Sequence, residues 1–160
     1  MKQIAALTIA SAVLLSGCAT GGDSAPPASH PERLSIAVGA CYGTCPVYTV
    51  TVGQDGTGQF DGKEHVATQG VRSFRTTPAT YGALIAALKP FRPMTGTTAQ
   101  TQCGQQVSDQ PTYVITWIAD GGRETVLNHN RGCFSTSNRQ LNAVLEQTPD
   151  KLGIRPLIGR

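Results

Sequence analysis

Two cysteines, Cys41 and Cys45, lie between two stretches in which apolar and polar residues alternate. Leu34 to Val38 repeats with a period of two, and Val47 to Gly53 is rich in valine, threonine and tyrosine. Both patterns predict strands that bury one face. The segment between them therefore joins two strands, and a disulfide between Cys41 and Cys45 would close this segment on itself.

Two further strands are predicted after this pair. Asp55-Gly56 reads as a hairpin turn because glycine tolerates positive φ. Thr57 to Phe60 then returns as a third strand, Asp61-Gly62 forms another turn, and Glu64 to Val71 makes a weaker fourth strand. These stretches together predict an antiparallel meander.

A helix is predicted after the meander. Thr77 suits the N-cap, Pro78 suits the first helical position, and Pro90 ends the helix because the residue before a proline avoids the helical region. Its apolar stripe consists of Tyr81, Leu84, Ile85 and Leu88. The helical spacing of this stripe predicts that one side of the helix is buried.

The second half of the chain begins with a long polar segment, Phe91 to Val107, which is predicted to be irregular. Pro111 to Ile118 and Arg123 to Asn128 then form a hairpin, and Ser137 to Gln140 has capping-box spacing before a short helix that ends at Pro149. The fold class is therefore predicted to be α+β, with an antiparallel sheet (meander plus hairpin) and two helices packed on one face. We assign residues 33–160 to this single domain.

The N-terminus carries the pattern of an export signal. A lysine at position 2 precedes an apolar run from Ile4 to Leu15, which is too short to cross a bilayer and suits a secretory signal. Leu15-Ser16-Gly17-Cys18 resembles the lipobox of bacterial lipoproteins. The resemblance implies a signal peptide over residues 1–17, a lipidated Cys18, and a Gly-, Ser-, Ala- and Pro-rich tether through residue 32 that anchors the domain to a membrane. Because Ala19 follows Cys18, the lipoprotein sorting rule implies the outer membrane, facing the periplasm, in a Gram-negative cell.

Four cysteines remain beyond Cys18, and an even number in an exported chain indicates disulfides. Three pairings are possible, and the sequence alone does not choose among them. We favour Cys41 with Cys45 and Cys103 with Cys133.

The distribution of charge gives no support for nucleic-acid binding. The 13 lysines and arginines are scattered, and aromatic residues make up only 6% of the chain, so no basic patch with interleaved aromatics is present. The sequence therefore does not predict nucleic-acid binding.

A family resemblance rests on Cys41-Tyr42-Gly43-Thr44-Cys45-Pro46-Val47-Tyr48, on Asp55-Gly56, Gly62 and Gly70, and on Asp109-Gln110-Pro111-Thr112. In these motifs the chain is similar to the bacterial family catalogued as domain of unknown function 6438, over roughly Leu34 to Leu145. Many members of this family look like exported lipoproteins. The resemblance implies a domain but no activity, and it brings no catalytic residues.

The cysteine motif leaves alternatives open. Cys41 and Cys45 have the spacing, with the following proline, of the copper chaperones of cytochrome oxidase assembly, and two thiolates with an imidazole suit copper. His129 would complete such a site, with His65 as the other candidate. A thiol-redox role would instead need a thiolate of lowered pKa, and the nearest cation in sequence is Arg33. The leading hypothesis remains a structural disulfide without a metal or a cofactor.

One polar cluster, Asn128-His129-Asn130-Arg131, is a candidate ligand or partner surface. It is predicted to be a loop close to Cys133, where a disulfide to Cys103 would hold it beside another polar loop. The sequence contains no Gly-x-Ser-x-Gly or His-Glu-x-x-His motif. We therefore expect a non-enzymatic, lipid-anchored envelope protein that binds an envelope partner or supports an assembly, with thiol-redox or copper handling as the alternative.

Overall fold

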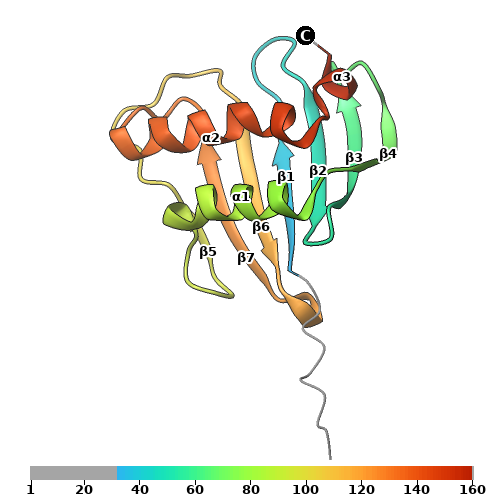
Figure 1. The fold of residues 1–160 in the computed structure, drawn as a ribbon. Helices are drawn as coiled ribbons and strands as arrows, with labels where there is room; N and C mark the ends of the chain where they lie inside the picture. The colour runs from blue at the N-terminus through green and yellow to red at the C-terminus, as the bar shows by residue number, and fades with distance from the viewer. Residues whose placement is uncertain (1–31, 160) are drawn as a thin grey trace, which may run out of the picture.

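The computed structural model describes residues 32–159 as a seven-stranded sheet with helices in front of it (Figure 1). The strands are β1 (Arg33–Val38), β2 (Val47–Gly53), β3 (Thr57–Glu64), β4 (Gly70–Arg75), β5 (Thr98–Gln100), β6 (Thr112–Ile118) and β7 (Glu124–Asn130). The helices are α1 (Pro78–Leu88), α2 (Thr136–Leu152) and α3 (Arg155–Ile158), with the 3₁₀ turns η1 (Lys89–Phe91) and η2 (Asp120–Gly122). The predicted signal peptide, Cys18 and the tether up to residue 31 lie outside the described residues.

The strand order in the sheet is β4-β3-β2-β1-β6-β7-β5. All neighbouring strands are antiparallel except β5, which lies parallel to β7. The predicted α+β class is confirmed, but the sheet is mixed and not wholly antiparallel. The parallel strand β5 lies within the segment that is predicted to be irregular. It could not be predicted from the sequence because three residues are too few to show an alternating pattern.

One face of the sheet forms the core, in three rows of side chains that cross the central strand β1. The rows meet β1 at Leu34, Ile36 and Val38, and the register places these residues opposite β2 and β6. The rows read Val52–Leu34–Trp117, Val50–Ile36–Ile115 and Tyr48–Val38–Tyr113, and all nine side chains are buried. Because side chains alternate across a strand, the residues between them lie on the other face of the sheet.

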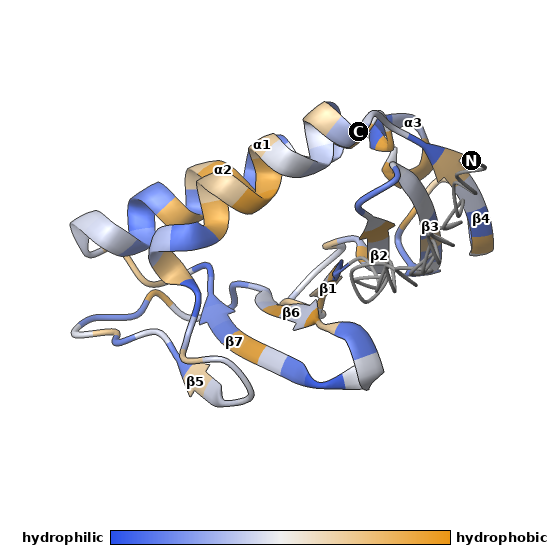
Figure 2. Ribbon diagram, turned by 60° about the horizontal axis from the view of Figure 1, so that its bottom comes forward, coloured by the Kyte–Doolittle hydropathy of each residue, from blue (hydrophilic) through white to orange (hydrophobic). Residues whose placement is uncertain are grey.

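Helices α1 and α2 lie on the same side of the sheet in two views (Figure 1, Figure 2). The hydroxyl of Thr77 caps α1 by accepting a hydrogen bond from the backbone N–H of Thr80 at 3.0 Å, as the sequence predicts. The buried residues of the two helices complete the core with Tyr81, Leu84, Leu88, Leu141, Leu145 and Leu152.

Two predicted boundaries in the sheet are wrong. Strand β3 continues through the Asp61-Gly62 pair that was predicted to be a turn, and β4 covers Gly70–Arg75 instead of Glu64 to Val71. Gly62 is needed in the strand because a Cβ there would lie 2.1 Å from the carbonyl oxygen of Thr68. The chain reverses later, where His65 adopts a positive φ of 52°.

The boundaries of α2 also differ from the prediction. The N-cap is Ser135, whose hydroxyl accepts a hydrogen bond from the backbone N–H of Asn138, and not Ser137. The helix continues past Pro149 to Leu152, and Gly153 ends it with a φ of 73°. A proline within a helix removes one backbone donor, but Pro149 is only one turn from the end of α2.

Candidate functional site

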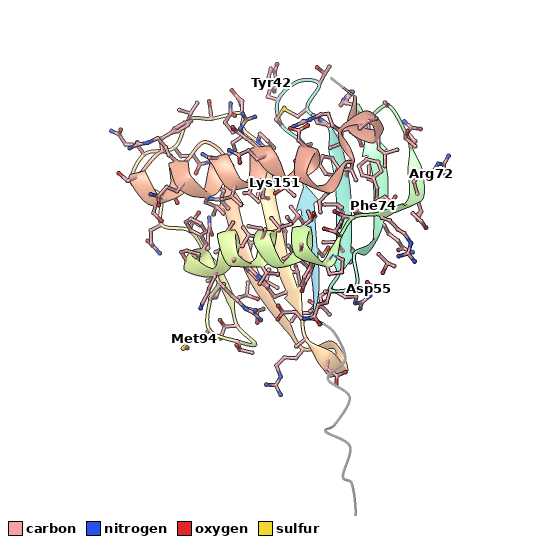
Figure 3. The ribbon with its side chains drawn as sticks, viewed as in Figure 1. Tyr42, Asp55, Arg72, Phe74, Met94 and Lys151 are labelled. Atoms are coloured by element: carbon pink, nitrogen blue, oxygen red, sulfur yellow. A yellow bond between two sulfur atoms is a disulfide. The ribbon has the colours of Figure 1, made fainter. Side chains whose placement is uncertain are left out.

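The domain begins at one end of the sheet, and the loop that carries Cys41 and Cys45 lies at the other end. β1 starts at Arg33, directly after the first described residue, and ends at Val38. The cysteine loop, which we define as residues 39–46, follows β1 and so lies at the opposite end of the sheet from the start of the domain. Figure 3 shows this separation, with Tyr42 on the loop at one end and Asp55 in the β2–β3 turn at the other.

A disulfide closes the cysteine loop. Cys41 and Cys45 are bonded, with their Cα atoms 5.7 Å apart, and Cys103 is bonded to Cys133. This is the pairing that we favoured from the sequence. The backbone N–H of Gly39 donates a hydrogen bond to the carbonyl oxygen of Thr112 at 2.9 Å, which ties the start of the loop to β6. The tip of the loop presents an aromatic side chain to solvent, since 88% of Tyr42 is exposed.

A hollow of about 310 Å³ lies beside the cysteine loop, on the core side of the sheet. Its floor is the last row of the core, in which Val38 separates Tyr48 from Tyr113. Because the valine side chain is smaller than the two tyrosines beside it, it leaves space at the centre of the row. Cys45 and the proline that follows it form one wall, and residues of α2 and α3 form the other.

The two tyrosines that line the hollow are largely buried, and their hydroxyls have no hydrogen-bond partner among residues 32–159. Tyr48 is 7% exposed and Tyr113 is 8% exposed. Burial raises the pKa of Tyr48 far above its usual value, and the nearby Tyr113 adds to this shift. Burial also raises the pKa of Tyr113. Both phenols are therefore neutral at physiological pH and able to donate hydrogen bonds into the hollow.

Two ion pairs border the hollow. Arg131 contacts Glu146, with Nε 3.0 Å and an Nη atom 2.7 Å from the same carboxylate oxygen. Arg155 donates to both carboxylate oxygens of Asp150, at 2.9 and 2.7 Å. The hydrogen bond from Arg155 lowers the pKa of Asp150, so this pair is charged at neutral pH. Arg131, Glu146 and Arg155 line the hollow, which gives its wall two positive groups and one negative group.

His129 is not part of a surface loop. It belongs to β7, and its side chain is fully buried on the core face. Nε2 lies 2.8 Å from the amide oxygen of Asn142, and Nδ1 lies 3.0 Å from the hydroxyl of Thr101. Burial lowers the pKa of the imidazole. The expected loop is therefore a strand whose histidine has a partner for each ring nitrogen.

The four residues of the predicted polar surface do not share one face, because β7 directs neighbouring side chains to opposite sides of the sheet. Asn128 and Asn130 point away from His129, because side chains alternate along β7. Asn130 holds the following turn, since its amide oxygen accepts a hydrogen bond from the backbone N–H of Gly132 at 2.8 Å. Of the four predicted residues, the structure brings only Arg131 to the hollow.

The structure does not assemble the alternative copper site. Cys41 and Cys45 are joined in a disulfide, and His129 makes the contacts described above. His65, the other candidate ligand, is exposed at the end of β3. Within the described part of the chain, no three His, Cys, Asp or Glu residues are grouped so that they could hold a metal ion.

A larger groove, of about 900 Å³, lies at the end of the sheet where the domain begins. The charged side chains on its walls, including Arg33, Asp55 and Arg75, are exposed. Asp55 accepts hydrogen bonds from the backbone N–H and the hydroxyl of Thr57, so its carboxylate stabilises the β2–β3 turn. The hollow, by contrast, is lined by two largely buried tyrosines and two ion-paired arginines, and we therefore take the hollow as the candidate site.

Sequence reasoning missed the tyrosines and Arg155. The signal was present for Tyr48 and Tyr113, because the alternation of β2 and β6 puts both on the core face. Their common position at the cysteine end depends on the pairing of each strand with β1, which the alternation does not determine. Arg155 lies in a tail for which no side-chain position was predicted.

The fold and the site define a small α+β domain with a disulfide-closed loop and an adjoining polar hollow. The chain belongs to the family described as Domain of unknown function (DUF6438), whose family model matches residues 32–150. No curated protein matches the chain, and no solved structure matches it. Among the described residues, no helix has the length and apolar character needed to span a membrane.

Proposed function

We propose that this protein is a lipid-anchored component of the bacterial cell envelope that binds a partner through its cysteine loop and hollow. Leu15-Ser16-Gly17-Cys18 after an apolar run supports lipidation of Cys18. More than one acyl chain is needed for stable anchoring, which agrees with the modification that a lipobox implies. In a Gram-negative cell, Ala19 after the lipidated cysteine favours the outer membrane, facing the periplasm.

The observation that carries this proposal is the separation between the start of the domain and the cysteine loop. The anchored segment joins the domain at Glu32, and Arg33 opens β1 at that end of the sheet. The cysteine loop lies at the far end of the same strand (Figure 3). A domain tethered through Glu32 would therefore present the loop and the hollow away from the membrane.

The loop has the properties of a binding surface. Tyrosine is enriched among residues that dominate interface energies, and Tyr42 is 88% exposed at the tip of the loop. The disulfide between Cys41 and Cys45 limits the conformations of the loop, which reduces the entropy lost on binding. Binding, and not catalysis, is the function that these features support.

Site-specific photo-crosslinking in cells tests the binding role. A photo-crosslinking residue at Thr44, on the cysteine loop, should yield a discrete adduct, and Tyr42→Ala should weaken it. A crosslinker at Met94 is the matched control, because Met94 is 80% exposed but lies toward the other end of the molecule (Figure 3). Equal adducts from both positions, or an adduct from Thr44 that is unchanged by Tyr42→Ala, would contradict the proposal.

Lipidation is tested separately. Metabolic labelling with palmitate should mark the wild-type chain, and Cys18→Ala should abolish the label and release the protein from the membrane fraction. Cys41→Ala/Cys45→Ala, which leaves the lipobox intact, should remain labelled. Undiminished label on the Cys18→Ala protein would refute the anchor.

A further inference from the structure

We propose that the hollow beside the cysteine loop binds an aliphatic carboxylate, and this inference builds on the binding role proposed above. The hollow holds two tyrosine hydroxyls with no partner among the described residues, from Tyr48 and Tyr113, and it is bordered by two guanidinium groups. Neither hydroxyl is fully buried, since Trp117 Nε1 is the one buried side-chain polar atom without a partner among the described residues. Largely buried tyrosines whose hydroxyls have no protein partner can donate hydrogen bonds to a ligand in the hollow that they line.

The donors in the hollow outnumber the acceptors. Each neutral phenol donates one hydrogen bond, and a guanidinium carries five N–H donors, some of which remain after the ion pairs of Arg131 and Arg155. Glu146, the carboxylate residue in the lining, already accepts a hydrogen bond from Nε of Arg131 and forms an ion pair with the same guanidinium. A ligand that supplies acceptors and a negative charge would complement this arrangement.

Size and polarity narrow the ligand class. The volume of about 310 Å³ is at the lower limit for small-molecule sites. Apolar side chains form the rest of the lining, among them Val38, Leu145 and Ile158. A carboxylate has two acceptor oxygens for the two phenols, and a short aliphatic group attached to it would contact the apolar wall. A phosphate would bring more charge and no apolar surface.

The same chemistry has two sources, a free short-chain acid and the C-terminal carboxylate of a partner protein. Four probes separate them: isovalerate, isovaleramide, the peptide N-acetyl-Gly-Val and the C-terminal amide of that peptide. In isothermal titration at pH 7, both acids should bind and both amides should bind at least tenfold more weakly. Tighter binding of the peptide acid than of isovalerate identifies a protein terminus, and the reverse order identifies a free acid.

Variants assign the binding to the hollow. Tyr48→Phe and Tyr113→Phe each remove one donor and keep the aromatic ring, and each should weaken the binding of the acids about tenfold, the usual effect of a hydrogen bond to a charged group. Both variants should unfold at or above the wild-type temperature, because the hydroxyls lack partners within residues 32–159. Tyr42→Phe, which changes a phenol outside the hollow, is the matched control and should bind as the wild type does.

Three results would overturn the inference: no binding of either acid, equal binding of acids and amides, or tighter binding of inorganic phosphate than of isovalerate. A fourth would be wild-type affinity in Tyr48→Phe/Tyr113→Phe. These results would leave the crosslinking test at Thr44 unaffected, because that test depends on Tyr42 and not on the hollow. Loss of the crosslink with intact binding of acids would instead contradict only the proposed partner surface.

Discussion

Nε2 of His129 lies 2.8 Å from Oδ1 of Asn142, in the interior between β7 and α2. The amide of Asn142 is oriented by its nitrogen, which donates to the carbonyl oxygens of Arg131 and Cys133 at 3.0 and 3.3 Å. Its oxygen therefore faces the imidazole and accepts a hydrogen bond from Nε2–H, while the hydroxyl of Thr101 donates a hydrogen bond to Nδ1. The pair fixes the tautomer of His129, while burial lowers the pKa of the imidazole and the hydrogen bond to Asn142 opposes this shift.

Stability should therefore depend on pH through His129. Burial lowers the pKa of the folded imidazole, whereas in the unfolded chain a histidine titrates near pH 6.5. Below about pH 6.5 the unfolded state binds the extra proton, so the unfolding free energy falls as the pH decreases, by at most about 1.4 kcal/mol per pH unit. Above that pH this contribution is fully present. Urea unfolding between pH 5.5 and 8 measures the slope.

The control for this slope uses both described histidines. His129→Gln removes the titrating group and should flatten the dependence near pH 6.5, although it lowers stability at every pH. His65→Gln changes an exposed histidine and should keep the wild-type slope. An unchanged slope in His129→Gln would show that another group is responsible.

The strands of the core and the first helix could be predicted from local patterns. Leu34 to Val38 shows its alternation in five residues, and Thr77-Pro78 is a specific helix start. His129 was misplaced because its polar neighbours resemble a loop, while the period of two that includes Leu127 continues through it. Polarity alone does not separate a loop from a strand that buries one histidine.

The hollow could not be predicted because it depends on contacts between distant parts of the chain. Tyr48 and Tyr113 lie on either side of Val38 only because β2 and β6 both pair with β1 in this register. Arg155 reaches them through α3, after Gly153 has turned the chain at the end of α2. Each strand was visible in the sequence, but their order in the sheet was not.

The two disulfides should differ in their contribution to stability. In the loop-entropy description, the bond from Cys103 to Cys133, which spans a sequence separation of 30, stabilises by about 3.7 kcal/mol. The bond from Cys41 to Cys45 spans a separation of 4 and contributes about 2 kcal/mol. Serine substitution of each pair, followed by urea unfolding, measures both values. An equal loss in both double variants would contradict the loop-entropy explanation.

Gly62 should tolerate no side chain. A Cβ at this position would lie 2.1 Å from the carbonyl oxygen of Thr68, which is backbone and so cannot move aside cheaply. Gly62→Ala should therefore lower the unfolding free energy by about 1–3 kcal/mol. Gly82 is the matched control, because it lies exposed in α1 with nothing within 4 Å of a Cβ. Gly82→Ala should raise stability by up to about 1 kcal/mol, and a loss in both variants would contradict the steric explanation.

Arg92 joins the start of the domain to its core. Nη1 donates to a carboxylate oxygen of Glu32 at 3.0 Å, and the guanidinium carbon lies 5.4 Å from the centre of the Trp117 ring. Arg92→Met removes both interactions and leaves Glu32 without its cation, so the unfolding free energy should fall by about 1–3 kcal/mol. Arg123→Met, at an exposed arginine, should change it by less than about 0.5 kcal/mol. Trp117 is the only tryptophan of the chain, so its fluorescence should change in Arg92→Met alone. Matching spectra and stabilities in the two variants would show that Arg92 is no more than a surface cation.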